Sequence, residues 1–162
     1  MEQVYDVIII GSGPAGLSAA IYAQRAKLST IIIEANYISG GQVVNTYEVD
    51  NYPGLPGISG MDLSTTLREH AEKMGSEFVR DEVLEVKLED GVKTVATKNA
   101  EYKAKSILLA TGAKHRHLGV PGEQKLSGSG VSYCATCDGA FFKNKTVVVV
   151  GGGDVAVEDA IF

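Results

Sequence analysis

Short apolar runs separated by glycine-rich turns fill the beginning of the sequence. Val4–Ile10 is an almost unbroken β-branched run, which is typical of a strand buried on both faces of a parallel sheet. Gly11–Gly16 interrupts this run. Leu17–Ala26 is rich in small residues without Gly or Pro and predicts a helix, and Thr30–Glu34 is a second apolar run. This order of strand, helix and strand predicts a right-handed crossover in an open α/β sheet.

The composition of the chain changes after this strand–helix–strand unit. Residues 35–60 are rich in Gly, Pro, Asn and Ser, which predicts a long ordered loop of the kind that is commonly functional. Residues 62–74 then predict a helix with one apolar face. That face carries Leu63, Leu67, His70 and Met74.

Alternating polar and apolar positions follow the helix. Glu77–Glu89, Val92–Thr97 and Glu101-Tyr102 predict a small antiparallel meander. Asp90-Gly91 has the composition of a hairpin turn between the first two strands.

Two further features divide the chain. Ser106–Ala110 predicts another buried strand, and Leu118–Gly130 is a loop rich in Gly, Ser and Pro that we interpret as a domain boundary. The first domain is therefore expected at residues 1–115, and residues 116–162 are expected to begin a second one. The predicted fold class is α/β, a three-layer Rossmann-like nucleotide-binding domain with a small antiparallel meander, followed by the truncated start of a second Rossmann-like domain.

Composition narrows the function classes. Apolar residues make up 44% and charged residues 22%, as in a folded globular protein. With a net charge of −5 and no cluster of Lys and Arg, nucleic acid is not an expected partner. No apolar run approaches the ~20 residues that cross a bilayer, so no membrane association is expected. Two cysteines and the absence of a secretory signal favour the cytoplasm.

The first glycine turn fits a dinucleotide-binding fingerprint. Gly11 permits the tight turn, Gly13 lets the backbone approach a pyrophosphate, and Gly16 allows close packing of helix and strand. Glu34 ends the next strand at the spacing of the acid that binds ribose hydroxyls, which favours FAD or NAD over NADP. The alternatives are a glycine-rich connector without a ligand, and a solvated acid at Glu34.

A second fingerprint lies near the end of the chain. Gly151, Gly153 and Ala156 match the same pattern after the apolar run Thr146–Val150, which predicts a buried strand. Two fingerprints in one chain are expected of an enzyme that moves electrons from a nicotinamide to a flavin. The chain stops within the next helix, so we expect this second site to be incomplete, the chain alone to be inactive, and the open strand to pair with another copy or fold back on the first domain.

The two cysteines form a Cys-x-x-Cys pair, Cys134 and Cys137. A redox pair is favoured because two nucleotide motifs provide an electron path, and Asp138 can exchange the proton that thiol–disulfide exchange requires. A zinc site completed by His115 and His117 and a pair of inert buried cysteines remain alternatives.

Together these residues resemble the bacterial-type, low-molecular-weight thioredoxin reductases from end to end of the chain. Cys-Ala-Thr-Cys-Asp-Gly at 134–139 is the most diagnostic motif. The other motifs that carry the resemblance are Gly11-Ser12-Gly13-Pro14-Ala15-Gly16, Ser39-Gly40-Gly41-Gln42, Asn51-Tyr52-Pro53-Gly54, Ala110-Thr111-Gly112-Ala113 and Gly151-Gly152-Gly153-Asp154-Val155-Ala156.

The resemblance implies roles for single residues. On the FAD, Glu34, Ala35, Gly40, Gly41 and Gln42 would hold the adenosine and pyrophosphate. Further contacts implied are Asn51 near the flavin, Val83 at the adenine, and Ala110, Thr111 and Gly112 against the cofactor. Cys137 would be the flavin-side sulfur, Cys134 would attack the disulfide of thioredoxin, and Asp138 would be the acid–base group.

The implied function is a homodimeric flavoprotein that passes electrons from NADPH through FAD and the Cys134–Cys137 pair to thioredoxin or a thioredoxin-like disulfide. Family members have about twice this length, so the resemblance also implies that this chain is an N-terminal piece of the enzyme. Alternatives are a related flavoprotein that reduces a peroxidase partner, a non-catalytic nucleotide-binding module, and a structural zinc module.

Overall fold

The computed structural model describes residues 3–89 and 91–162, except for the side chain of Cys137. The chain divides into two compact units, the first ending at Ala113 and the second beginning at Lys114. A domain boundary after residue 115 stays a prediction. No helix within the described ranges is long and apolar enough to cross a membrane.

The first unit is built on one six-stranded sheet with the strand order β3-β2-β1-β6-β5-β4. Strands β3, β2, β1 and β6 run parallel, whereas β6, β5 and β4 form an antiparallel meander. The elements are β1 (Val4–Ile10), α1 (Pro14–Arg25), β2 (Thr30–Glu34), the 3-10 helix η1 (Gly41–Asn45), α2 (Gly60–Lys73), β3 (Glu77–Arg80), β4 (Val83–Lys87), β5 (Lys93–Thr97) and β6 (Glu101–Leu109).

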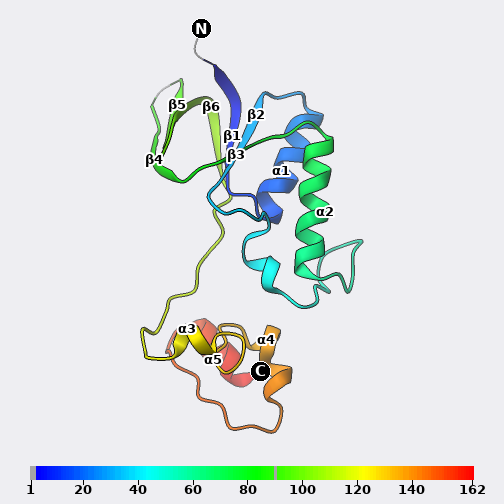
Figure 1. Ribbon diagram of the computed structural model, residues 1–162, viewed down its shortest axis with the longest axis vertical. Coiled ribbons are helices and arrows are strands. Elements are labelled where there is room, and N and C mark those ends of the chain that lie inside the picture. Colours follow the sequence, from blue (N-terminus) through cyan, green and yellow to red (C-terminus); the bar gives the residue numbers. More distant parts are fainter. Residues whose placement is uncertain (1–2, 90) are drawn as a thin grey trace. The chain divides into compact units, whose positions relative to one another are not determined.

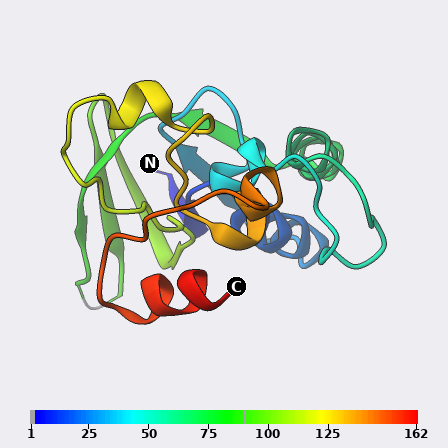
Figure 2. The ribbon, with the colours of Figure 1, turned by 90° about the horizontal axis from the view of Figure 1, so that it is seen from below.

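Three layers result, with the parallel strands in the middle (Figures 1 and 2). Ile9 and Ile32 face the helices and join a core with Leu17 of α1 and Leu63 of α2. The alternate side chains of the same strands face the meander, in a second core of Ile8, Ile10, Ile31, Ile33, Val95 and Ala104. Because side chains alternate along a strand, a strand covered on both sides needs apolar residues at every position. The Rossmann-like fold expected from the sequence is therefore confirmed.

The predicted strand at Glu77–Glu89 is wrong, since it is two strands in different parts of the sheet. β3 is a parallel strand beside β2, and β4 is the outer strand of the meander. The chain turns between them at Asp81, whose buried carboxylate accepts hydrogen bonds from Thr97 and Asn99. These bonds join residues distant in sequence, so the alternation of side chains carried no sign of the break.

Strand β6 is longer and less buried than predicted. It runs continuously from the meander into the parallel sheet, so residues 101–102 and 106–110 are not separate strands. Leu108 is 37% exposed and Leu109 69% exposed, because β5 pairs with β6 only as far as Ala104. The prediction of a fully buried strand is therefore wrong at this end.

Both helices of the first unit begin earlier than predicted. Pro14 occupies the first turn of α1, where its missing N–H removes no hydrogen bond. Helix α2 is capped by the Ser59 hydroxyl, which accepts from the Asp62 N–H. His70, expected on the apolar face of α2, is exposed. The hairpin between β4 and β5 has Gly91 at φ 87, and its predicted partner Asp90 lies outside the described residues.

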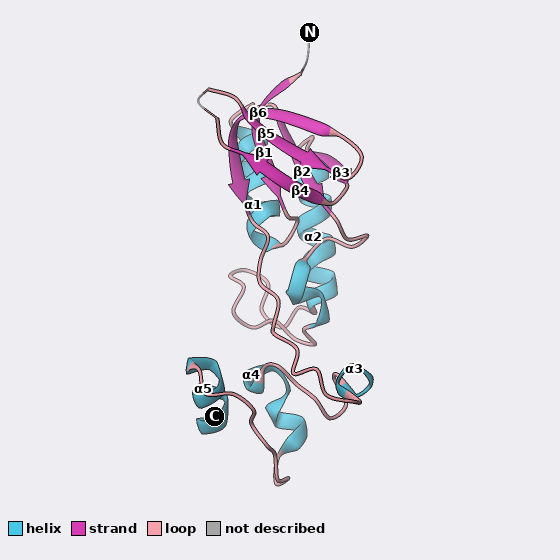
Figure 3. Ribbon diagram, turned by 90° about the vertical axis from the view of Figure 1, so that its left-hand side faces the viewer, coloured by secondary structure: helices cyan, strands magenta, loops and turns pink. Residues whose placement is uncertain are grey.

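The second unit contains helices and loops, and no strand of the described chain lies in it (Figure 3). Its elements are α3 (Glu123–Leu126), α4 (Ala135–Asp138), the 3-10 helix η2 (Gly139–Phe142) and α5 (Asp154–Ile161). Helix α3 lies within the stretch expected to be loop. The predicted buried strand at Thr146–Val150 is wrong: no strand forms there, and Val148 is 85% exposed. A strand requires hydrogen bonds to a neighbour, and none of the described strands pairs with this run.

Candidate cofactor and redox sites

The three glycines of the turn between β1 and α1 differ in what surrounds them. A Cβ at Gly11 would lie 2.3 Å from the Ala110 carbonyl oxygen, and one at Gly16 would lie 2.0 Å from the Gly11 carbonyl oxygen. These two glycines are therefore required by packing within the protein. A Cβ at Gly13 would meet only the Gly40 carbonyl oxygen, at 3.8 Å, so Gly13 borders open space.

The beginning of α1 provides hydrogen-bond donors beside this space. The N–H groups of Ala15 and Gly16 donate to no described residue, and Pro14 has no N–H. Gly13 is the N-cap and supplies no side chain that would satisfy them. A helix N-terminus with free N–H groups and a partial positive charge is suited to bind a phosphate.

Glu34 ends β2 at the same edge of the sheet. Its Oε2 accepts hydrogen bonds from the N–H and hydroxyl of Ser12, at 2.9 and 2.8 Å, and its Oε1 accepts from the N–H and side-chain amide of Asn36, at 2.8 and 2.9 Å. Burial raises the pKa of this carboxyl, but these hydrogen bonds outweigh burial and hold the pKa below its ordinary value. The group is therefore an ionised acceptor at neutral pH.

A second glycine segment faces the first. The Gly40 N–H donates to the Ser12 carbonyl at 2.8 Å, and a Cβ at Gly41 would lie 4.0 Å from the Gly13 Cα. Both glycines have positive φ, of 120 and 62, which favours glycine at these positions. The two loops thus line one gap, and a side chain at Gly13 or at Gly41 would narrow this gap.

The segment after β6 completes this edge. The Ala110 N–H donates to the Ile10 carbonyl at 2.8 Å, which places Ala110 against the first turn. The side-chain amide of Gln42 donates to the carbonyl of Ala113, so η1 is tied to the same segment. Thr111 and Gly112 are exposed between these two contacts, and Gly112 has φ 65 with open space around it.

Asp81 lies next to Glu34, and the sequence pattern did not indicate a role for it. It accepts hydrogen bonds from the N–H of Glu82 and from the hydroxyl of Thr97 at 2.8 and 2.7 Å, and two more from Asn99. Its own N–H donates to the Glu34 carbonyl at 3.0 Å. The hydrogen bond from Thr97, above all, lowers the pKa of Asp81 below its ordinary value. Asp81 therefore fixes the start of β4, where Val83 lies, relative to Glu34.

Two predicted residues are not brought into this arrangement. Ala35 is exposed just beyond Glu34, and Asn51 is exposed in the loop between η1 and α2. None of the contacts described above reaches Asn51. Its assignment near a flavin therefore stays a prediction that depends on the resemblance alone.

The second unit holds the cysteine motif. Cys134 is disulfide-bonded and its N–H donates to the Ser132 hydroxyl oxygen at 3.1 Å. The Ser132 hydroxyl lies 2.6 Å from Oδ2 of Asp138, to which it donates. One hydroxyl therefore links the backbone of Cys134 to the carboxylate predicted as the acid–base group. The side chain of Cys137 lies outside the described part of the structure.

The histidines of the zinc alternative have other neighbours. The His115 ring stacks on Tyr133 with centroids 3.6 Å apart, and His117 Nδ1 lies 3.2 Å from the Tyr133 hydroxyl. Among the described side chains, no group of three or more His, Cys, Asp or Glu is placed to hold a metal ion.

The second glycine motif forms a turn before α5. Gly151 has φ 139, and a Cβ there would lie 3.0 Å from that of Ala156. Gly153 is the N-cap of α5 without a side-chain hydrogen bond. The turn therefore has the glycine geometry of the first fingerprint, but no described strand leads into it.

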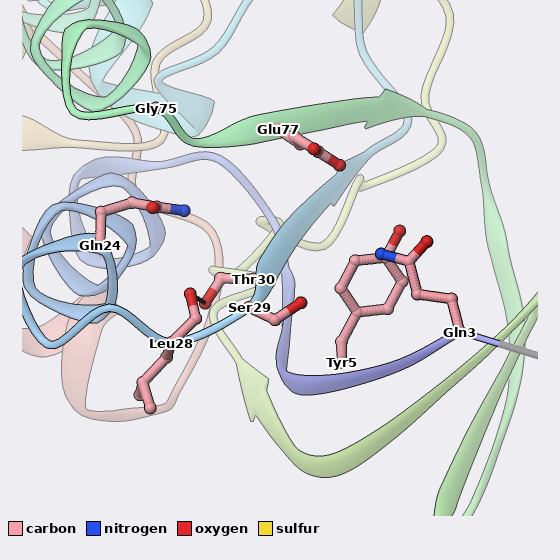
Figure 4. A pocket seen from close by; sticks show the side chains of 8 residues that line it. All are labelled: Gln3, Tyr5, Gln24, Leu28, Ser29, Thr30, Gly75 and Glu77. Carbon is pink, nitrogen blue, oxygen red and sulfur yellow. Dashed lines mark hydrogen bonds between the residues drawn. The ribbon is translucent and has the colours of Figure 1, made fainter.

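A hollow of about 160 Å³ lies at the opposite edge of the sheet. Figure 4 shows Gln3 and Tyr5 at the start of β1, Gln24 of α1 and Glu77 at the start of β3 around it. Ligands of open α/β sheets bind outside the carboxyl ends of the strands. The edge with Gly13 and Glu34 is therefore the candidate cofactor site.

Comparison with known proteins gives one consistent result. Residues 5–162 match the family model described as pyridine nucleotide-disulphide oxidoreductase. The chain is 53% identical to a thioredoxin reductase of Bacillus subtilis, over 99% of this chain and 51% of that protein. It is 54% identical to a thioredoxin reductase of Peptoclostridium acidaminophilum, over 100% of this chain and 51% of that one. The crystal structure of thioredoxin reductase from Streptococcus pyogenes matches with a TM-score of 0.86 and 50% identity, covering 99% of this chain and 52% of its own. The chain thus spans about half the length of the curated relatives it matches.

Proposed function

The chain belongs to the pyridine nucleotide-disulphide oxidoreductase family, and from this premise we propose that the whole protein is a thioredoxin reductase. In this proposal electrons pass from NADPH to FAD, then to the Cys134–Cys137 disulfide, and then to the disulfide of thioredoxin or a thioredoxin-like protein. The identity of about 53% to thioredoxin reductases supports the choice of acceptor.

One observation carries the FAD half of the proposal. Gly13 borders open space between two glycine loops, beside free N–H groups at the start of α1. A pyrophosphate fits this place because it needs close backbone approach, N–H donors and a positive helix end. Glu34, at the same edge, is the acceptor for ribose hydroxyls.

The acceptor sites of Glu34 are all occupied in the structure, and this limits how ribose can bind. An ionised carboxylate offers about four lone-pair sites, and Ser12 and Asn36 fill them. Two donors are backbone N–H groups and two are side chains that can rotate. Ribose hydroxyls would therefore replace the Ser12 hydroxyl and the Asn36 amide while the backbone bonds remain.

The redox half rests on the cysteine motif. FAD and NADPH, when bound, supply the two electrons that reduce the disulfide. Reduction of a disulfide to two thiols also requires two protons, and Asp138 is the proposed acid–base group. Its hydrogen bond from Ser132 holds the carboxylate beside the backbone of Cys134. In the proposed order, Cys134 then attacks the disulfide of thioredoxin and Cys137 resolves the mixed disulfide.

Three further assignments belong to the proposal. Gly151, Gly153 and Ala156 would contribute to the NADPH site. The working assembly is a homodimer, as the resemblance implies. The proposed location is the cytoplasm, because an enzyme that supplies reduced thiols serves a compartment where thiols are kept reduced.

The test uses the whole protein, purified and examined by visible absorption. We expect a flavin spectrum that is bleached by NADPH and restored by oxidised thioredoxin. Cys134→Ser should keep the bleaching and lose thioredoxin reduction. A protein that cannot be loaded with FAD contradicts the flavin half, and a Cys134→Ser variant that reduces thioredoxin at the unaltered rate contradicts the cysteine assignment.

A further inference from the structure

A buried carboxylate lies just before the cysteine motif and has no part in the function proposed above. Glu123, at the start of α3, is 5% exposed. Its Oε1 accepts a hydrogen bond from the Leu118 N–H at 2.7 Å, and its Oε2 accepts one from the Gly119 N–H at 2.6 Å. The carboxylate therefore closes the loop at 118–119 onto the start of α3.

The same carboxylate reaches the residue before Cys134. The Tyr133 hydroxyl donates to Oε1 of Glu123 at 2.6 Å. His117 completes the group, with Nδ1 3.4 Å from Oε1 of Glu123 and 3.2 Å from the Tyr133 hydroxyl. The stacked ring of His115 covers the other side of Tyr133. Tyr133 is thus held at its hydroxyl and along its ring.

The electrostatics favour one protonation pattern. The hydrogen bond from Tyr133, above all, lowers the pKa of Glu123 to about 2, and the same bond raises the pKa of Tyr133 above its ordinary value. At neutral pH the carboxylate is charged and the phenol keeps its proton. A hydrogen bond to a charged acceptor is among the stronger ones in proteins.

We propose that Glu123 and Tyr133 are positioning residues for the redox pair, which hold Cys134 in the geometry of its disulfide. The inference deepens the proposed function and rests on it for the use of the disulfide. The contacts described above exist in a structure in which Cys134 is disulfide-bonded. Cys134 directly follows Tyr133, which Glu123 holds, and its own N–H donates to the Ser132 hydroxyl, which in turn donates to Asp138.

The sign of the effect follows from this geometry. A disulfide demands that two sulfurs stay in one narrow arrangement, whereas the two thiols accept many. Bonds that hold the backbone of Cys134 in the disulfide arrangement therefore stabilise the oxidised form more than the reduced one. Weakening these bonds should make the disulfide easier to reduce.

The experiment is a redox titration of the whole protein in glutathione buffers, with thiols trapped by an alkylating reagent and those of Cys134 and Cys137 counted by peptide mass. Tyr133→Phe removes only the oxygen that binds Glu123. We expect it to lower the equilibrium constant for disulfide formation about three- to tenfold, which is about 14 to 30 mV for a two-electron couple. Tyr47→Phe is the matched control, because Tyr47 is 84% exposed and lies far along the chain, and it should leave the titration unchanged.

A second variant tests the route. Glu123→Gln should shift the titration in the same direction, and the double variant should shift it no further than the larger single one, because both act through one hydrogen bond. Since Glu123→Gln also disturbs two backbone N–H groups, Tyr133→Phe decides the matter if the former does not fold. An unchanged titration in Tyr133→Phe, or shifts that add in the double variant, would overturn the inference. The titration needs neither FAD nor NADPH, so failure of the proposed function would show separately, as a lack of thioredoxin reduction.

Discussion

Adding one methyl group to Gly13 should weaken FAD binding at least a hundredfold and leave the fold intact. Gly13 has φ −71 and ψ 179, which alanine adopts without strain. The added Cβ would meet only the Gly40 carbonyl oxygen, at an ordinary contact distance of 3.8 Å. Alanine is a poorer N-cap than glycine, which costs about 1 kcal/mol at most. For a unit of this size that is a fall in melting temperature of about 4–8 °C.

The cost to the cofactor should be much larger. In the proposed site the methyl group occupies the gap that lets the backbone approach a pyrophosphate. We expect at least a hundredfold rise in the Kd for FAD, equivalent to about 2.7 kcal/mol. Titration of the flavin-free protein with FAD, followed by flavin fluorescence, measures the Kd, and thermal unfolding without FAD measures the fold.

Gly16→Ala is the matched control, because it adds the same methyl group where packing forbids it. Its Cβ would lie 2.0 Å from the Gly11 carbonyl oxygen, which forces the turn to move. Because the blocking atom belongs to the backbone and cannot rotate away, the cost lies at the upper end of the about 1–3 kcal/mol typical of overpacking. This exceeds both the gain of up to about 1 kcal/mol that alanine brings to a helix and the cost expected for Gly13→Ala. Gly16→Ala should thus lower the melting temperature even without FAD. FAD binding by Gly13→Ala with the unaltered Kd, or a fall in its melting temperature beyond that of Gly16→Ala, would refute the reasoning.

Three other outcomes are expected. Glu34→Gln should weaken FAD binding about tenfold. Asn36→Ala should leave the Kd unchanged or lower it, because the variant removes an amide donor that competes with the ribose hydroxyls for Glu34. The same FAD titration measures both Kd values. Asp81→Asn should lower the melting temperature of the flavin-free protein, since an amide offers donors to groups that are themselves donors, whereas Asp50→Asn, at an exposed position, should not. The pKa of Glu123 in the folded protein is about 2, against an ordinary value of about 4.3. Its contribution to stability is therefore complete above pH 4.3 and is lost as the pH falls toward 2. Over that interval the melting temperature should fall more steeply in the unaltered protein than in Glu123→Gln.

The parts of the fold that could be predicted from sequence are those set by neighbouring residues. The runs that became β1 and β2 and the glycine turn between β1 and α1 depend on local pattern and backbone sterics, and these are readable. The break between β3 and β4 could not be predicted, because Asp81 makes it by bonding Thr97 and Asn99, more than a dozen positions away. Nothing about an isolated aspartate in an alternating segment signals such partners.

The prediction of a strand at 146–150 was wrong for a related reason. Its valines satisfy every local criterion for a buried strand, yet a strand exists only when another strand pairs with it. Among the candidate site residues, the placement of Gly13 and Glu34 at one edge of the sheet could be predicted from their spacing, since a fingerprint fixes both; their role in binding stays a prediction. Glu123 was not found, because its role depends on Tyr133 meeting it across a loop.

The hydrogen bonds that Glu34 already accepts bear on which residues would provide the affinity for a dinucleotide. Four hydrogen bonds from Ser12 and Asn36 already satisfy its carboxylate. Ribose hydroxyls would replace two of them one for one, and such an exchange changes the free energy little, because equal numbers of bonds are broken and made. The N–H groups at the start of α1 donate to no described residue, so a pyrophosphate gains its hydrogen bonds there without displacing any within the protein. In the proposed site Glu34 would therefore select the ligand, by rejecting a phosphate on the ribose, while the gap at Gly13 would provide most of the binding. This division of roles is why a methyl group at Gly13 is expected to cost more affinity than the loss of the charge on Glu34.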